Sequence, residues 1–359
     1  MQTKHEVLYR DSRKLDFLAD ESVHLVVTSP PYPMIEMWDE TFIGLNKEDY
    51  QATFELMHRE LDKVWKELFR VLKTGGFACI NIGDATRTIG GRFQLFPNHF
   101  RILQAFWGNG FDNLPMILWR KQTNAPTKFM GSGMFPAGAY VTLEHEYILI
   151  FRKGAKRNFK TEAEKVNRWE SAIFWGERNR WYSDLWDFKG TRQDLVSLNA
   201  NLRQRSGAYP FLLPYRLINM YSVYGDTVLD PFWGTGTTTL AALASGRNSV
   251  GCEIDKNFTV FLDEKLMDPS LPEQLNDYHR VRIQKHLQFI EDYSSQKGHL
   301  PKYLNRHYKF PVVTRQETSL KFMPVKKIIK EKKDYYLASY GYPEKMQSLE
   351  NMLSRKIEK

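Results

Sequence analysis

Short apolar runs rich in β-branched residues alternate with amphipathic segments of helical length along most of this chain. The runs typical of buried strands are 22–28, 77–82, 114–120, 147–152, 227–229 and 249–253. The helix-like segments are 50–72, 97–107, 210–224 and 237–245, the first of them predicted to stop at Gly75 and Gly76. Strands separated by helices build a mostly parallel sheet with right-handed crossovers. The sequence therefore predicts an α/β fold.

Two unusual strings follow directly on predicted strands. Thr28-Ser29-Pro30-Pro31-Tyr32 closes the strand at 22–28, and DPFWGTGTT at 230–238 follows the strand at 227–229. In an open α/β sheet, ligands bind beyond the carboxyl ends of the strands, near the point where the strand order reverses. We therefore expect both strings to lie on one rim of the sheet, although about two hundred residues separate them.

The second string is typical of a loop that cradles a nucleoside cofactor. Its glycines let the backbone approach a ligand closely, and the N-terminus of the following helix offers free N–H groups. The string is not a Walker loop, and it does not complete a GxGxxG pattern, because Thr238 and Thr239 stand where the last glycine is needed. Glu253 ends the next strand, where a carboxylate can bind ribose hydroxyls. A structural turn with a solvent-facing Glu253 is the alternative interpretation.

The first string suits a site that holds a planar amino group. The exocyclic amine of cytosine or adenine is a poor nucleophile because its lone pair is delocalised into the ring. Two hydrogen-bond acceptors, the Ser29 side chain and the Pro30 carbonyl, can turn the amine towards tetrahedral geometry. Pro30 and Pro31 stiffen the loop, and Tyr32 offers a ring on which an extruded base can stack. A Pro-Pro turn with a core tyrosine is the alternative.

Composition excludes several other chemistries. The chain has only two cysteines, Cys79 and Cys252, and both lie inside apolar runs typical of core strands, so we expect no activated thiolate. No His pair has the spacing of a helical zinc site, and we expect no metal. The sequence has neither a signal-like N-terminus nor an apolar run long enough to span a membrane, so we expect a soluble, cytoplasmic protein.

The formal charge of +9 is concentrated in two segments. Residues 301–359 hold fourteen Lys or Arg against six Asp or Glu, and residues 152–205 hold thirteen against seven. The second segment mixes cations with aromatic residues, a combination suited to phosphates and bases. Its candidate DNA contacts are Arg178, Arg180, Trp181 and Arg192. A packed subdomain with a tryptophan core is the alternative for this segment, and a solvated lysine-rich tail is the alternative for the other.

The two strings in this order resemble the beta class of amino-group DNA methyltransferases. In that class the target-amine motif precedes the cofactor motif, within a circularly permuted, Rossmann-like catalytic domain. GGFACINIGD at 75–84 and HEYILIFRK at 145–153 also fit this layout. The resemblance implies four parts: a catalytic subdomain at 1–153, a target-recognition region at 154–205, the cofactor-binding part of the same catalytic domain at 206–257, and a helical and basic C-terminal extension at 258–359.

The resemblance also implies the chemistry. Ser29, Pro30, Pro31 and Tyr32 would hold the flipped base. The implied S-adenosylmethionine pocket is formed by Asp11, Asp230, Phe232, Gly234, Gly236, Glu253 and Phe211. The serine form of the first motif is similar to that of N4-cytosine enzymes, and duplex DNA is the implied partner, with a cognate restriction endonuclease in a bacterial or archaeal cell. N6-adenine methylation and a non-catalytic nucleic-acid-binding protein on this fold are the alternatives.

Overall fold

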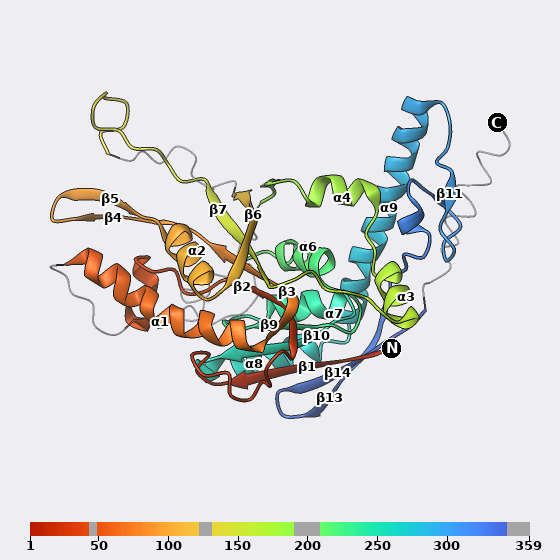
Figure 1. Ribbon diagram of the computed structural model, residues 1–359, viewed down its shortest axis with the longest axis horizontal. Coiled ribbons are helices and arrows are strands. Elements are labelled where there is room, and N and C mark those ends of the chain that lie inside the picture. Colours follow the sequence, from red (N-terminus) through yellow and green to blue (C-terminus); the bar gives the residue numbers. More distant parts are fainter. Residues whose placement is uncertain (43–48, 122–130, 190–208, 343–359) are drawn as a thin grey trace.

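The fold is built on one ten-stranded sheet, seen in a computed structural model that describes residues 1–42, 49–121, 131–189 and 209–342 (Figure 1). The strands run in the order β13-β14-β1-β10-β9-β2-β3-β7-β6-β8. Their bounds are β1 Gln2–Tyr9, β2 Val23–Thr28, β3 Leu72–Ile82, β6 Phe111–Arg120, β7 His145–Lys153, β8 Leu185–Asp187, β9 Thr227–Asp230, β10 Asn248–Glu253, β13 Val325–Lys332 and β14 Tyr335–Tyr340. The pairs from β1 to β3 are all parallel, whereas β7 and β14 pair antiparallel with both of their neighbours.

Helices cover both faces of the sheet. The α-helices are α1 Tyr50–Val71, α2 Asn98–Gly108, α3 Glu162–Glu170, α4 Trp175–Trp181, α6 Leu212–Tyr221, α7 Thr237–Ala244, α8 Thr259–Leu266 and α9 Leu271–Lys297. α1 and α2 pack on one face, and α6 and α7 pack on the other (Figure 1). β2 supplies both cores, because Leu25 and Val27 face the α6 side while Val23 and Val26 face α1.

Smaller elements extend from this core. A hairpin of β4 Ala85–Ile89 and β5 Arg92–Phe96 projects from the body on the same side as the segment that leads into β7 (Figure 1). Two short strands, β11 Tyr303–Leu304 and β12 Pro311–Val312, pair with each other near α9. Three 3-10 helices, η1 Glu36–Thr41, η2 Lys256–Phe258 and η3 Arg315–Glu317, complete the description. In the part of the chain that the structure describes, no helix is both long and apolar enough to cross a membrane.

The predicted α/β fold is confirmed, with differences at three places. Gly75 and Gly76 do not stop α1, since the helix ends at Val71 and both glycines belong to β3. There Gly75 takes a positive φ of 82°, beside an irregularity in the pairing of β2 with β3. The strand β1 was not predicted. The C-terminal extension at 258–359, predicted to be helical and basic, also contains strands: its lysine-rich part at 325–332 forms β13, an edge strand whose exposed lysines discourage pairing with a further strand.

Candidate functional site

The two strings meet at the carboxyl ends of adjacent parallel strands, as predicted. β2 and β9 pair in parallel, with Leu25 opposite Val228. The Thr28 hydroxyl donates to Asp230 Oδ1 over 2.6 Å, so a hydrogen bond joins the two motifs directly. From this point the chain crosses over to β3 on one side of the pair and to β10 on the other. The pair is therefore the place where the strand order reverses, which is where α/β sheets bind ligands.

Asp230 is a buried anchor for this junction. Its Oδ2 accepts hydrogen bonds from the hydroxyls of Thr238 at 2.6 Å and Tyr209 at 3.3 Å, and its Oδ1 also accepts from the Phe232 backbone N–H at 3.1 Å. Burial raises the pKa of this carboxyl. Asp230 therefore fixes the end of β9, the start of α7 and the TSPPY segment relative to one another. Tyr209, to which the sequence assigned no role, completes the anchor.

The glycine-rich loop is shaped by a buried tryptophan. The Trp233 indole N–H donates to Thr239 Oγ1 over 2.9 Å, and the ring is only 2% exposed. A Cβ at Gly236 would lie 2.5 Å from this ring, and Gly236 also takes a left-handed φ of 77° at the start of α7. A side chain at Gly236 is excluded on both counts. The loop thus presents backbone, with the free N–H groups of a helix N-terminus, to whatever binds there.

Glu253 lies beside this loop at the end of β10. Its Oε2 accepts from the Gly234 backbone N–H at 2.8 Å, and its Oε1 accepts from the Asp255 N–H at 2.9 Å. Burial raises the pKa of the carboxyl. Each oxygen keeps lone-pair capacity beyond its backbone partner, so the side chain can accept further bonds from hydroxyl groups. The alternative of a solvent-facing Glu253 does not describe this half-buried, backbone-bonded carboxylate.

Asp11 and Phe211, two further candidates, are partly occupied by other contacts. Tyr9 of β1 pairs with Glu253 of β10, so Asp11 follows a strand end next to the glycine loop. The Arg13 guanidinium donates to both Asp11 oxygens at about 3 Å, which is the largest cause of the lowered pKa of that carboxyl. The Phe211 ring, before α6, packs on Tyr278 of α9 with centroids 4.2 Å apart.

The TSPPY segment continues into a chain of hydrogen bonds that the sequence did not predict. The Ser29 hydroxyl donates to Tyr32 Oη over 3.1 Å, and the Tyr32 hydroxyl donates to Glu146 Oε2 over 3.0 Å. Asn81 Nδ2 donates to both Tyr32 Oη and Glu146, and Lys121 Nζ pairs with the same carboxylate. Asn81 lies in the string at 75–84, and Glu146 lies in the string at 145–153. Both strings contribute to the family resemblance, but neither residue was assigned a role from the sequence.

The basic aromatic region at 154–205 contributes buried aromatic side chains to the main core as well as exposed cations. The prediction that Trp181 contacts DNA is wrong, because its ring is 6% exposed and packs in the core beside Trp186. Arg178 and Arg180 are exposed on α4, as a DNA contact requires. Arg192 lies outside the described residues. β8, from the same region, joins the sheet beside β6.

Neither cysteine has the exposed, activated thiol that a nucleophile needs. Both are buried, and burial raises the pKa of the Cys252 thiol to about 12. Within the described parts of the chain, no group of His, Cys, Asp or Glu side chains is arranged to hold a metal ion.

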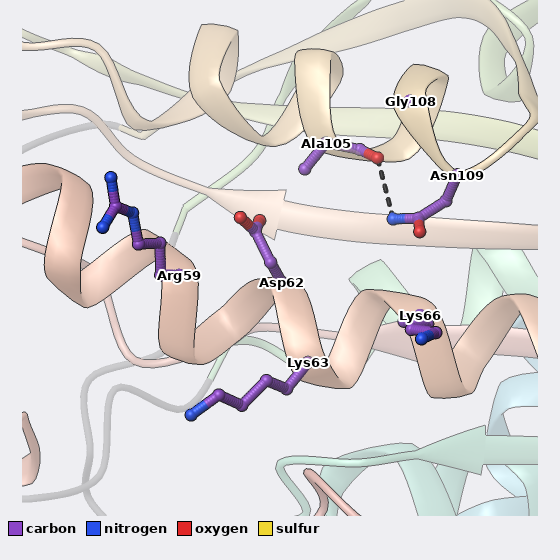
Figure 2. Close-up of a pocket in the computed structure, with 7 residues that line it drawn as sticks. All are labelled: Arg59, Asp62, Lys63, Lys66, Ala105, Gly108 and Asn109. Carbon is purple, nitrogen blue, oxygen red and sulfur yellow. Dashed lines mark hydrogen bonds between the residues drawn. The ribbon is translucent and has the colours of Figure 1, made fainter.

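A pocket away from the two motifs lies between α1 and α2 (Figure 2). It is lined by Arg59, Asp62, Lys63, Lys66, Ala105, Gly108 and Asn109. Asp62 is already engaged by Arg101 at 2.7 Å, and Asn109 Nδ2 donates to the Ala105 carbonyl at 2.8 Å. None of the lining residues belongs to either motif, so this pocket is separate from the site on the sheet rim.

Comparisons with known proteins identify the class of enzyme. The N6/N4 DNA methylase family model matches residues 23–261. The type II methyltransferase M.MthZI of Methanothermobacter thermautotrophicus is 51% identical over 331 residues, covering 89% of this chain and 90% of the relative. M.MjaI of Methanocaldococcus jannaschii is 50% identical, covering 74% of this chain and 91% of the relative. This chain therefore belongs to the N6/N4 DNA methylase family and is a DNA methyltransferase.

A solved structure agrees with this assignment. A DNA modification methylase of Thermus thermophilus, complexed with S-adenosyl-L-methionine, superposes with a TM-score of 0.56 at 34% identity and covers 72% of this chain and 93% of its own. The predicted Rossmann-like methyltransferase fold is confirmed, and so is the predicted cofactor, S-adenosylmethionine, at the level of the family.

Proposed function

We propose that this protein transfers the methyl group of S-adenosylmethionine to the N4 amine of a cytosine flipped out of duplex DNA, as the modifying partner of a restriction endonuclease in the cytoplasm. The observation that carries the proposal is the serine at position 29 of TSPPY, held beside the cofactor loop by the bond between Thr28 and Asp230. The relatives named type II methyltransferases support the setting of restriction and modification.

The cofactor loop fits a nucleoside with a charged tail. Phe232, Gly234 and Gly236 would line the pocket, with Glu253 accepting from the ribose hydroxyls. Asp11 would accept from the adenine amine, Asp230 would lie near the methionine part, and Phe211 would close the pocket. When bound, S-adenosylmethionine supplies an activated sulfonium methyl group. The protein then needs only to align the amine for in-line attack and to exclude water.

The amine would be held by the first motif. Ser29 Oγ and the Pro30 carbonyl would accept its two N–H bonds, which frees the nitrogen lone pair for attack on the methyl. Tyr32 would stack on the base, and Pro31 would keep the loop rigid. Arg178 and Arg180, exposed on α4, would contact the DNA phosphates. No thiolate takes part in this reaction, because the nitrogen attacks the methyl directly.

The test uses duplex DNA of mixed sequence and cofactor labelled on its methyl group. Digestion followed by mass spectrometry of the nucleosides should find the label in N4-methylcytosine. Label in N6-methyladenine would overturn the cytosine assignment while keeping the amine chemistry. Absence of labelled DNA, together with absence of cofactor binding, would instead favour a nucleic-acid-binding protein that does not catalyse.

A second test concerns Ser29. Ser29→Ala should lower kcat strongly, by roughly 10²-fold or more as for loss of one transition-state hydrogen bond, while cofactor affinity in calorimetry stays nearly constant. Ser22→Ala is the matched control, since the Ser22 hydroxyl donates to the Ala19 carbonyl at 2.7 Å, at the start of the same strand and away from the rim. Loss of cofactor binding in Ser29→Ala would refute the role assigned to this serine.

A further inference from the structure

The hydrogen-bond chain that leaves the target-amine motif ends on a carboxylate. It runs from Ser29 through Tyr32 to Glu146, with Asn81 and Lys121 attached at its end. Glu146 is only 8% exposed and lies at the start of β7, far from TSPPY in sequence. A buried carboxylate joined to the motif through a single hydroxyl can act on Ser29 from a distance.

The carboxylate fixes the direction of every bond in the chain. An ionised carboxylate only accepts hydrogen bonds, so the single O–H of Tyr32 must point to Glu146. The Tyr32 oxygen is then an acceptor towards its other partners, and the Ser29 hydroxyl donates to it. With its hydrogen used in this way, Ser29 Oγ has only lone pairs to offer elsewhere. An acceptor is what an amine N–H requires.

Asn81 supplies independent support for this direction. Its Nδ2 donates to Tyr32 Oη at 2.8 Å and to Glu146 Oε2 at 2.6 Å. Its Oδ1 is buried and has no hydrogen-bond partner among the described residues. An unmet buried acceptor is unfavourable, yet the amide keeps this orientation, because its neighbours Tyr32 and Glu146 both accept from its Nδ2.

Lys121 is the cationic partner of Glu146. Its ammonium pairs with the carboxylate and lies over the Trp119 ring, 5.1 Å from the centroid. The side chain of Lys121, directly after β6, is 41% exposed, so the pair connects a buried anion to solvent. Tyr32 and Asn81 bond to Oε2 while Lys121 pairs with Oε1, so each of these contacts is one that the carboxylate accepts.

We propose that Glu146 is a positioning residue, which through Tyr32 orients Ser29 Oγ as an acceptor for the target amine and receives the amine proton along the same chain. This proposal rests on the proposed function. As the nitrogen bonds to the methyl carbon, the electron pair of the breaking C–S bond returns to sulfur. The N–H proton passes to Ser29 Oγ, the serine proton passes to Tyr32 Oη, and the tyrosine proton passes to Glu146 Oε2. One proton enters the chain and one arrives at the carboxylate.

The decisive variant is Glu146→Gln, which keeps the shape but adds a donor and removes the charge. The amide can donate to Tyr32 and reverse the chain, leaving Ser29 to offer a hydrogen to the amine. We expect kcat to fall by roughly 10²-fold, the usual range for loss of a positioned proton acceptor, with KM for DNA and the cofactor affinity nearly constant. Glu144→Gln is the matched control, because Glu144 lies two residues away and pairs with the exposed Arg120.

Coupling separates this role from a structural one. Tyr32→Phe should lower kcat by a similar factor, and the double variant Tyr32→Phe with Glu146→Gln should be no slower than the worse single variant, because both cut one chain. If the double variant loses kcat by the product of the two single losses, the inference is overturned while the proposed function stays intact. A Glu146→Gln enzyme with the kcat of the wild type would have the same consequence. If Glu146→Gln does not fold, an unchanged kcat in Tyr32→Phe overturns it. A wild-type protein that transfers no methyl group to DNA would overturn both proposals.

Discussion

The buried ion pair between Glu177 and Arg282 gives a quantitative test of how α4 is attached to the rest of the protein. Arg282 Nε donates to Glu177 Oε1 over 2.6 Å, and Nη2 donates to Oε2 over 2.8 Å. The side chains are 7% and 5% exposed for Arg282 and Glu177 respectively. The guanidinium also lies 4.9 Å from the Trp181 ring centroid. The pair therefore joins α4, with its exposed arginines, to the long helix α9.

Glu177→Gln should lower the free energy of unfolding by about 3 kcal/mol. Removing one partner of a buried pair leaves the other charge uncompensated, which costs about 3–5 kcal/mol. The lower end of this energy range applies because Arg282 keeps two other hydrogen-bond acceptors, Tyr215 Oη at 3.2 Å and Asn219 Oδ1 at 3.3 Å. Adding Arg282→Met should restore most of the loss, since the double variant removes the stranded charge.

Urea unfolding followed by circular dichroism measures this change, with the slope of the transition checked for constancy. The matched control is Glu273→Gln on α9, the helix that carries Arg282, and this change breaks the pair between Glu273 and Arg280. Glu273 is 67% exposed, so this change should cost at most about 1 kcal/mol. If Glu177→Gln and Glu273→Gln lower the free energy of unfolding equally, burial is not what makes the pair between Glu177 and Arg282 costly to break.

Three further outcomes are expected. Gly251→Ala should lower the free energy of unfolding by about 1–3 kcal/mol and weaken cofactor binding in calorimetry, because the new Cβ would lie 2.1 Å from Trp233 under the cofactor loop. Stability to urea should fall as the pH is lowered from about 6.5, by up to about 4 kcal/mol per pH unit, since the unfolded chain gains protons that the native state resists; a flat profile would contradict this. The largest contributions come from three buried histidines whose pKa burial lowers to about 3, namely His5, His58 and His279. Arg178→Ala or Arg180→Ala should weaken DNA binding in anisotropy titrations and reduce its salt dependence, with cofactor affinity unchanged; unaltered DNA binding in both would place recognition elsewhere.

The periodicity of apolar residues made the central strands and helices of the fold predictable, whereas β1, which buries polar side chains, was missed. β2 and α1 carry apolar side chains at the spacing of a buried strand and an amphipathic helix, so their existence followed from the sequence. β1 did not, because two of the side chains it buries are polar. Thr3 and His5 lie inside the sheet, bonded to each other and, through His5 Nδ1, to Ser249 of β10. A pattern of apolar residues cannot reveal a strand that buries hydrogen-bonded polar groups.

The candidate site shows the same division. Ser29 and Asp230 could be brought together from sequence, since each ends a predicted parallel strand. Glu146 could not be added to them, because β7 runs antiparallel to β3 and so its first residues, not its last, reach the active rim. The prediction that Trp181 contacts DNA was wrong for a different reason. Its neighbours Arg178 and Arg180 are exposed, and composition alone does not tell which side of a short helix faces the core.

The order of strands in the sheet explains how two motifs about two hundred residues apart in the sequence meet at one site. The chain enters the centre of the sheet at β2, moves outward to β3, and returns at β9 before moving the other way to β10. The crevice forms where β2 and β9 lie side by side with their connections leading in opposite directions, whichever strand comes first in sequence. α1 follows β2 on one face, whereas α7 follows β9 on the other. The TSPPY segment and the glycine-rich loop therefore each start a separate crossover, and the hydrogen bond from Thr28 to Asp230 joins them. Thr28→Val, which keeps the shape and removes that hydroxyl, should accordingly lower kcat more than it changes cofactor affinity.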